Sequence, residues 1–275
     1  MTLSYFIFLD PGPSTSEAGR TKSQKALPKM LQLLLSIRKE LKKNIDLNYK
    51  KGSKAFFKEP IKLYGVRSTN LKKIGSGYRQ RIKSLAKPEL IKLIEALFKS
   101  NFNEEFSLGS GWLYQRIDEF KEKDFKTLTG WLKYVTNWAM CDDYCSHPLG
   151  YFIYRYPEFI GQTKLWTNSK NRWVKRASAV THIHSTKKGS PFRKQIMRND
   201  KKYLKDVFEI SDKLLVDKDE LVQKGYGWLL KEAANLFPKE VFNYVMRSKK
   251  KMPRTALRYA IEKMPAKLKR RAMAK

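Results

Sequence analysis

Apolar residues recur along this chain at the spacing of an amphipathic helix, and this period restricts the fold more than any other feature. From residue 30 onward they fall at steps of three and four residues, as in Met30, Leu34, Ile37, Leu41 and Ile45. Alternating apolar and polar residues, which half-buried strands require, are nearly absent. The sequence therefore predicts an all-α protein.

The same period returns in many segments joined by short turns. We expect helices over 70–85, 88–99, 108–121, 124–145, 157–166, 171–184, 192–215, 219–235, 238–247 and 253–264. No single segment is apolar enough to form the centre of a bundle, so a stack of helix pairs fits better. The repeats are too degenerate to establish a period. The prediction is an α-solenoid over residues 25–275, preceded by a flexible tail of turn-forming residues over 1–24.

The folded body is expected to be strongly basic. The chain has 58 Lys and Arg against 26 Asp and Glu, a net charge of +32. Residues 25–102 carry 20 basic and 5 acidic side chains and residues 161–275 carry 30 and 10, whereas residues 103–160 carry 6 and 9. The excess thus lies in segments with helical periodicity. Nucleic acid and an anionic membrane are the leading partners, and a generally lysine-rich composition is the alternative.

No pattern in the sequence indicates a metal or a cofactor. Cys141 and Cys145 are one helical turn apart, which suits neither a disulfide framework nor, with His147, a complete zinc site. Glycine-rich phosphate loops and Ser-His-Asp motifs are missing. No apolar run approaches the ~20 residues that a membrane helix needs. We expect no cofactor, no membrane span and a reduced, cytoplasmic location, associated with the nucleoid when the protein is bound to DNA.

An aspartate interrupts one apolar stripe. If the helix over 124–145 is continuous, the stripe comprises Trp131, Val135, Trp138, Asp142 and Cys145. Burying an unpaired carboxylate costs several kcal/mol, so an aspartate in this position is usually paired, capping or functional. Two interpretations stay open: a functional Asp142, or Asp142 or Asp143 as the cap of a helix that restarts here, with Pro148 marking its end.

Two further segments combine tryptophan with cations, the first around Trp228 and the second from residue 171 onward. Trp228 has Lys224 and Lys231 as helical neighbours, so its indole could meet a sugar or base while the ammonium groups meet phosphates; packing between repeats is the alternative. Gly225 and Gly227 each lower helix propensity by roughly 1 kcal/mol relative to Ala, which suggests that a close backbone approach compensates.

The helix expected from residue 171 begins with several cations. Its first turns contain Arg172, Trp173, Lys175 and Arg176. Cations at this end oppose the helix dipole unless an anion is present, so the segment predicts a phosphate contact. A solvated helix face is the alternative.

Four motifs follow one another along the chain in a specific order. They are Trp138-Ala-Met-Cys-Asp142-Asp-Tyr-Cys, Ser169-Lys-Asn-Arg-Trp173-Val-Lys-Arg176-Ala-Ser-Ala, Val222-Gln-Lys-Gly-Tyr-Gly-Trp228-Leu-Leu-Lys-Glu and Met252-Pro-Arg-Thr-Ala-Leu-Arg258, and Tyr64-Gly65-Val66-Arg67 precedes them. Over roughly residues 50–270 the chain resembles the AlkD-like DNA alkylation repair proteins. The resemblance implies HEAT-like repeats curved around duplex DNA with a basic concave face. It also implies a monomeric, monofunctional glycosylase that removes N3- and N7-alkylated purines.

The resemblance also implies roles for particular residues. Asp142, four residues after Trp138, matches the family's catalytic carboxylate, and Trp228 matches its second active-site tryptophan. Arg176 matches a basic residue that holds the DNA backbone near the lesion. Lys231 stands where the family has an arginine, which keeps the charge and loses the bidentate fork. The expected DNA-binding residues are Arg176, Lys231, Lys175, Arg172, Trp173 and Lys224.

Two other classes of function compete with excision. A non-catalytic HEAT-repeat protein could bind damaged, bent or branched DNA without cutting glycosidic bonds. Loss of the aspartate or of either tryptophan would have favoured this alternative, but Asp142, Trp138 and Trp228 are all present. A scaffold for protein partners predicts mixed surface charge and a large apolar groove, and the two basic blocks argue against it. Salt dependence distinguishes the two kinds of partner, because binding to phosphates weakens steeply with salt.

Overall fold

The chain folds as a row of α-helices. The computed structural model describes residues 28–187 and 189–274, and the tail expected over 1–24 lies outside this part. The α-helices are α1 (Lys29–Lys43), α2 (Leu47–Lys54), α3 (Ser68–Gly77), α4 (Arg79–Lys83), α5 (Lys87–Lys99), α6 (Asn103–Gln115), α7 (Phe125–Gly130), α8 (Trp138–Tyr144), α9 (Gly150–Arg155), α10 (Ile160–Leu165), α11 (Arg172–Val180), α12 (Arg193–Arg198), α13 (Asp200–Leu214), α14 (Glu220–Ala234), α15 (Pro238–Ser248), α16 (Arg254–Ile261) and α17 (Ala266–Met273). Extended pairing within the described residues is limited to two isolated bridges. The predicted all-α class is confirmed.

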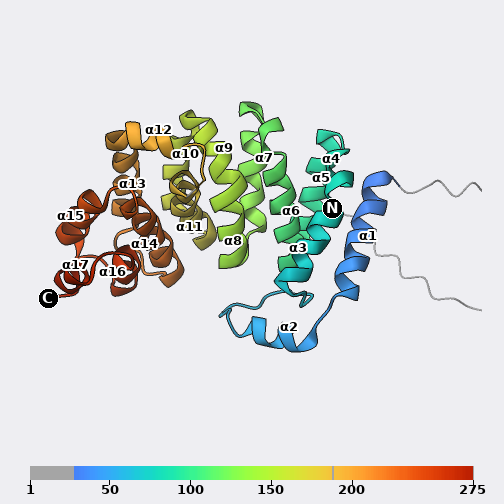
Figure 1. Ribbon diagram of the computed structural model, residues 1–275, viewed down its shortest axis with the longest axis horizontal. Helices are drawn as coiled ribbons and strands as arrows, with labels where there is room; N and C mark the ends of the chain where they lie inside the picture. Colours follow the sequence, from blue (N-terminus) through green and yellow to red (C-terminus); the bar gives the residue numbers. More distant parts are fainter. Residues whose placement is uncertain (1–27, 188, 275) are drawn as a thin grey trace, which may run out of the picture.

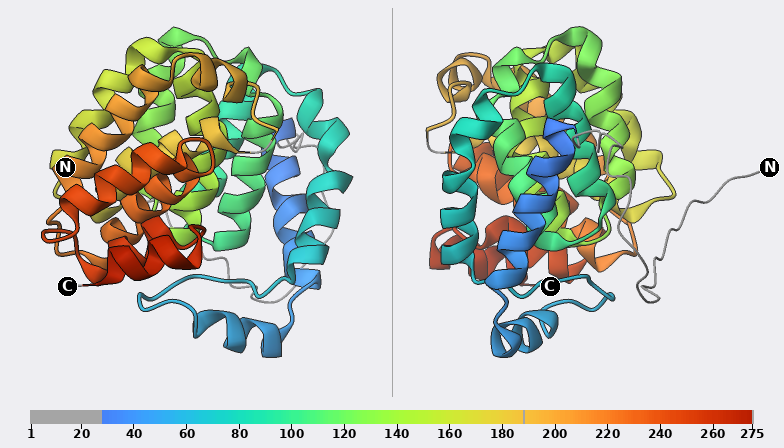
Figure 2. Two further views of the ribbon diagram at one scale, coloured as in Figure 1. Left: turned by 60° about the vertical axis from the view of Figure 1, so that its left-hand side comes forward. Right: turned by 90° about the vertical axis from the view of Figure 1, so that its right-hand side faces the viewer.

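The helices stand side by side along the long axis of the molecule, from α1 and α3–α5 at one end to α13–α17 at the other (Figure 1). Neighbours pack on one another, with α5 against α6, α11 against α14 and α14 against α16. Their buried apolar side chains form one cluster that runs from α1 to α17. The helix α2 and the segment after it lie outside this row in both views of Figure 2. The architecture is therefore an all-α helical repeat fold.

A buried carboxylate holds the loop that returns from α2 to the row. Glu104 accepts hydrogen bonds from the backbone N–H groups of Tyr64 (3.1 Å), Gly65 (2.7 Å) and Val66 (3.1 Å). Gly65 has φ +94°, and a Cβ there would lie 2.5 Å from the Cβ of Lys50. A glycine is needed at this turn, which explains the Tyr-Gly-Val motif physically.

The single helix expected over 124–145 is wrong. A 3₁₀ turn over Trp131–Tyr134 follows α7, and Val135 is extended with ψ 118°. Asn137 then caps α8, because its side chain accepts the N–H of Met140 at 3.0 Å. Trp131 and Val135 consequently leave the predicted stripe, whereas Trp138 and Asp142 remain together on α8.

The capping interpretation of the two aspartates is also wrong. Asp142 and Asp143 lie within α8, and Asn137 is its cap. Pro148 does not end the helix, since it belongs to a π-helical turn, Cys145–Leu149, that runs on into α9. A π turn changes the local hydrogen-bond register, which accommodates a residue without an N–H.

Other boundaries differ from the expected ranges. The segment 192–215 is divided at Asn199 into α12 and α13, and the segment 70–85 is divided at Tyr78 into α3 and α4. Neither α2 nor α17 was predicted. The first buries none of its residues and the second fully buries only Ala272, so neither has a fully buried apolar stripe.

Candidate functional site

The first predicted site residues lie on one face of α8. Trp138 is the first residue of this helix, and Asp142 follows one turn later. The indole packs partly against the core, and the Asp142 side chain is 23 % exposed. Both groups are therefore held in place and remain open to solvent.

A buried arginine holds the Asp142 carboxylate. Arg176, on α11, donates from Nε to Oδ1 at 2.9 Å and from Nη2 to Oδ2 at 3.0 Å. Its Nη1 donates to the carbonyl oxygen of Leu221, and its side chain is 5 % exposed. A bidentate pair of this kind fixes the plane of the carboxylate. Desolvation raises the pKa of Asp142 above its usual value, and the charge of Arg176 opposes this rise.

Two glycines let α14 approach its neighbours closely, Gly225 at Arg176 and Gly227 at α16, as their cost in helix propensity suggested. A Cβ on Gly225 would lie 3.1 Å from Cγ of Arg176. A Cβ on Gly227 would lie 2.8 Å from the carbonyl oxygen of Ala256 on α16. The predicted close approach is confirmed. Trp228 follows Gly225 by three residues, so the helix surface that contacts Arg176 also bears this indole.

Trp228 is both packed and accessible. Its ring lies against the core while part of it stays exposed. Its Nε1 donates to Oε1 of Glu232 at 3.2 Å, and Lys263 lies 3.3 Å from the same oxygen. Glu232 thereby sets the orientation of the indole. Packing between helices and contact with a ligand are thus compatible for this side chain.

The predicted DNA-binding cations are paired with acidic side chains of the protein. The pairs are Arg172 with Glu59 (2.7 Å) and Asp219 (2.6 Å), Lys175 with Asp217 (2.5 Å), Lys224 with Glu220 (2.8 Å), and Lys231 with Glu262 (3.1 Å). Trp173 is 7 % exposed and belongs to the core. The guanidinium of Arg176 faces Asp142 inside the protein. Contacts of these residues with DNA stay predictions, and phosphates would have to replace carboxylates as partners of the four surface cations.

Sequence reasoning missed a polar network behind α8. Lys187 Nζ lies 3.0 Å from Oγ of Ser146, 3.1 Å from its carbonyl oxygen and 3.1 Å from Nε2 of His147. Nδ1 of His147 lies 3.0 Å from the carbonyl oxygen of Asp143. Burial lowers the pKa of both His147 and Lys187. No spacing pattern connects residues 147 and 187, so no sequence signal could have found this network.

The segment after α2 was missed as well. We call residues 55–60 the strap, because they reach from α2 to the helices beyond α8. Phe57 stacks on Trp138 with 5.0 Å between ring centroids and 16° between planes. Lys58 pairs with Glu220 at the start of α14 (2.8 Å), and Glu59 pairs with Arg172 at the start of α11. The paired aromatic residues Phe56 and Phe57 were its only signal in the sequence.

The described residues contain no group of three His, Cys, Asp or Glu side chains that could hold a metal ion. Cys141 and Cys145 are both buried, with their sulfur atoms 4.0 Å apart. In the same part of the chain, no helix has the length and apolar character to cross a membrane.

Comparisons with known proteins agree with the motifs. A family described as DNA alkylation repair enzyme matches residues 37–264. A solved structure described as a predicted DNA alkylation repair enzyme from Enterococcus faecalis has a TM-score of 0.67 and 13 % identity; the match covers 81 % of this chain and 98 % of that one. At this identity the likeness shows a shared fold. A search of curated proteins found no match. Since the family covers most of its length, the chain belongs to the DNA alkylation repair enzyme family.

Proposed function

We propose that this protein is a DNA glycosylase that hydrolyses the bond between deoxyribose and a cationic N3- or N7-alkylated purine in duplex DNA. The single observation that carries the proposal is the Asp142 carboxylate. It is held by the buried Arg176 and lies one helical turn from Trp138. Membership of the alkylation repair family supports a role on DNA.

The chemistry requires little beyond a fixed negative charge. An alkylated N3 or N7 purine is already cationic, so it leaves with the electron pair of the C1′–N bond and needs no general acid. Positive charge then develops on the deoxyribose, and water adds at C1′ and loses a proton. A carboxylate beside the sugar stabilises this oxocarbenium-like state, as in other glycoside hydrolysis. We assign this role to Asp142.

The neighbouring residues position the reacting groups. Trp138 and Trp228 each present a partly exposed indole, which can stack on the sugar of the lesion. Arg176 occupies both carboxylate oxygens of Asp142 from one side. The remaining lone pairs can then face the sugar or the attacking water. Arg176 is a positioning residue in this mechanism.

Release of free base tests the proposal. Duplex containing N7-methylguanine is incubated at low salt with the wild type, with Asp142→Asn or without protein, and untreated duplex serves as a further control. We expect release by the wild type and a loss on the order of 10²-fold or more in Asp142→Asn, with DNA affinity retained. Binding of the duplex without release by either protein would instead indicate a non-catalytic DNA-binding module.

A further inference from the structure

The strap contacts the beginnings of three helices that bear predicted site residues. Its partners Trp138, Arg172 and Glu220 are the first residues of α8, α11 and α14. These helices pack on one another in turn, α8 against α11 and α11 against α14. The strap therefore runs along one edge of the helical row, across the groups that the proposed function assigns to DNA.

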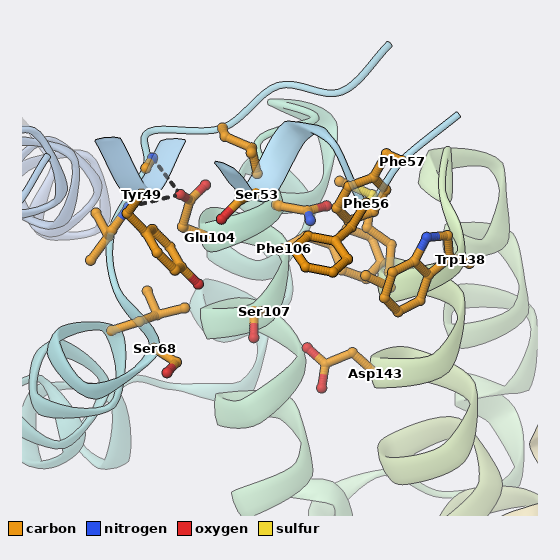
Figure 3. A pocket seen from close by; sticks show the side chains of 17 residues that line it. Tyr49, Ser53, Phe56, Phe57, Ser68, Glu104, Phe106, Ser107, Trp138 and Asp143 are labelled. Atoms are coloured by element: carbon orange, nitrogen blue, oxygen red, sulfur yellow. Dashed lines mark hydrogen bonds between the residues drawn. The ribbon is translucent and has the colours of Figure 1, made fainter. Parts of the chain in front are cut away.

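Two strap residues occupy groups that DNA would contact. Phe57 stacks on Trp138, whose indole is expected to meet the sugar of the lesion (Figure 3). The indole also packs against the core, so Phe57 covers part of the ring surface that would otherwise face solvent. Glu59 pairs with Arg172 at 2.7 Å, where a phosphate is expected. An aromatic ring and a carboxylate of the protein thus compete with the sugar and a phosphate of the duplex.

The base of the segment that carries the strap is firmly held. Ile45 and Val66 form an isolated antiparallel bridge, and the N–H of Asp46 donates to the carbonyl oxygen of Gly65 at 3.0 Å. Glu104 fixes the returning chain through the backbone N–H groups described above. The part between these points, α2 and the strap, projects from the row (Figure 2).

The strap itself is held weakly. No residue from 47 to 60 belongs to the hydrophobic cluster of the described chain. The side chain of Lys58 is 80 % exposed in its pair with Glu220, and that of Arg172 is 43 % exposed in its pair with Glu59. Such solvated ion pairs contribute little to stability. The strap can therefore leave the row without disrupting the core.

We propose that the strap is a lid, which closes the site in the free protein and which duplex DNA displaces before the lesion reaches Trp138. This inference rests on the proposed function, because that function places DNA on this face. The displacement is an exchange of partners: the sugar replaces Phe57 on the indole, and a phosphate replaces Glu59 at Arg172. The apparent affinity for DNA is then reduced in proportion to the fraction of molecules whose strap is open.

The distance between two spin labels tests the displacement. Phe56→Cys places one label on the strap, and Val216→Cys places the other just before α14; the two native side chains are 79 % and 67 % exposed. The natural cysteines are both buried and should not react. We expect longer distances when undamaged duplex saturates the protein. Labels at Val216→Cys and Leu165→Cys, which both lie in the row, should keep their distance.

Substitution of the stacking ring tests the competition. In Phe57→Leu the closed strap loses its aromatic contact, so the affinity for undamaged duplex should rise roughly two- to tenfold. Phe56→Leu is the matched control, since Phe56 is exposed and has no ring contact among the described residues. It should leave the affinity unchanged. The melting temperature of both variants should stay near that of the wild type, because the strap lies outside the core.

Two results would overturn the inference. One is an unchanged strap distance on saturating duplex. The other is equal or weaker DNA binding by Phe57→Leu, since the ring would then not compete with the duplex. A protein that binds no duplex would refute the proposed function and the lid together. If duplex opens the strap and no alkylated base is released, excision fails and the lid stands.

Discussion

Asp142 and Asp143 are consecutive residues with raised pKa values, and they differ in their ionic partners. Arg176 compensates Asp142 at hydrogen-bond distance, so its desolvation is opposed by a fixed positive charge. Asp143 has no such partner among the described residues. Burial raises the pKa of both side chains, and a single position along α8 thus separates a carboxylate with a fixed cationic partner from one without.

Removing Arg176 should impair the function of the Asp142 carboxylate although Asp142 itself is unchanged. In Arg176→Ala the desolvation of Asp142 is no longer opposed, so its pKa rises further. We expect base release to fall at neutral pH, with the acid limb of the pH–rate profile displaced to higher pH. Arg176→Lys retains the charge and loses the bidentate geometry, so its displacement should be smaller. Identical profiles for wild type and Arg176→Ala would exclude the positioning role.

The ionised carboxylate of Asp143 should lower the free energy of unfolding. The pKa of Asp143 is about 6 in the folded chain against 3.8 ordinarily, so the folded state binds more protons between these values. The cost is absent below about pH 4, grows as the pH rises and is complete above about pH 6. Because the side chain is 35 % exposed, solvent reduces it to the order of 1 kcal/mol. Asp143→Asn should therefore stabilise the protein at pH 7 and not at pH 4 in urea unfolding; a gain of equal size at both pH values would contradict this assignment.

In helix α14, low helix propensity is opposed by the close packing that it permits. Its glycines weaken the isolated helix, yet they allow it to contact both Arg176 and α16. In Gly227→Ala the new methyl group would lie 2.7 Å from Cβ of Tyr259 and 2.8 Å from the carbonyl oxygen of Ala256. We expect a loss of about 1–3 kcal/mol in the free energy of unfolding, although Ala favours a helix by about 1 kcal/mol.

Gly52→Ala is the control for this prediction. Gly52 also lies in a helix, α2, and a Cβ there would meet nothing within 4 Å. Its substitution should be neutral or stabilising in the same measurement. Equal effects at the two positions would mean that propensity, and not contact with α16, decides the behaviour of glycine in this fold.

The helices that could be predicted from the sequence are those whose buried apolar residues recur at regular spacing. The helices α1 and α5 bury one regular stripe each, and their positions follow from it. By contrast α2 buries nothing, and the break before α8 depends on Asn137 and on the extended Val135. The same holds for the site. Asp142 was predicted as a candidate because it interrupts an apolar stripe in the sequence. The strap and Lys187 come to the neighbourhood of α8 from distant segments, and no local pattern encodes such an approach.

At the scale of the whole molecule, the net charge of +32 overstates the number of cationic side chains that are free to contact DNA. Cations near the site, such as the largely buried Lys231, already have carboxylate partners. Each such carboxylate competes with a phosphate for the same ammonium group. The long-range attraction depends on the total charge, but the local contacts depend on how readily these pairs exchange.

Removing one competing carboxylate should therefore strengthen DNA binding more than its charge alone predicts. Glu262→Gln frees Lys231, whereas Glu158→Gln removes the same formal charge from an exposed residue without an ion pair among the described residues. We expect tighter binding to undamaged duplex in Glu262→Gln and a salt dependence steeper by up to about one phosphate contact, with little change in Glu158→Gln. The measurement is duplex affinity over a series of salt concentrations. Equal gains in the two variants would show that Lys231 does not contact the backbone, and that the attraction arises from the total charge of the protein.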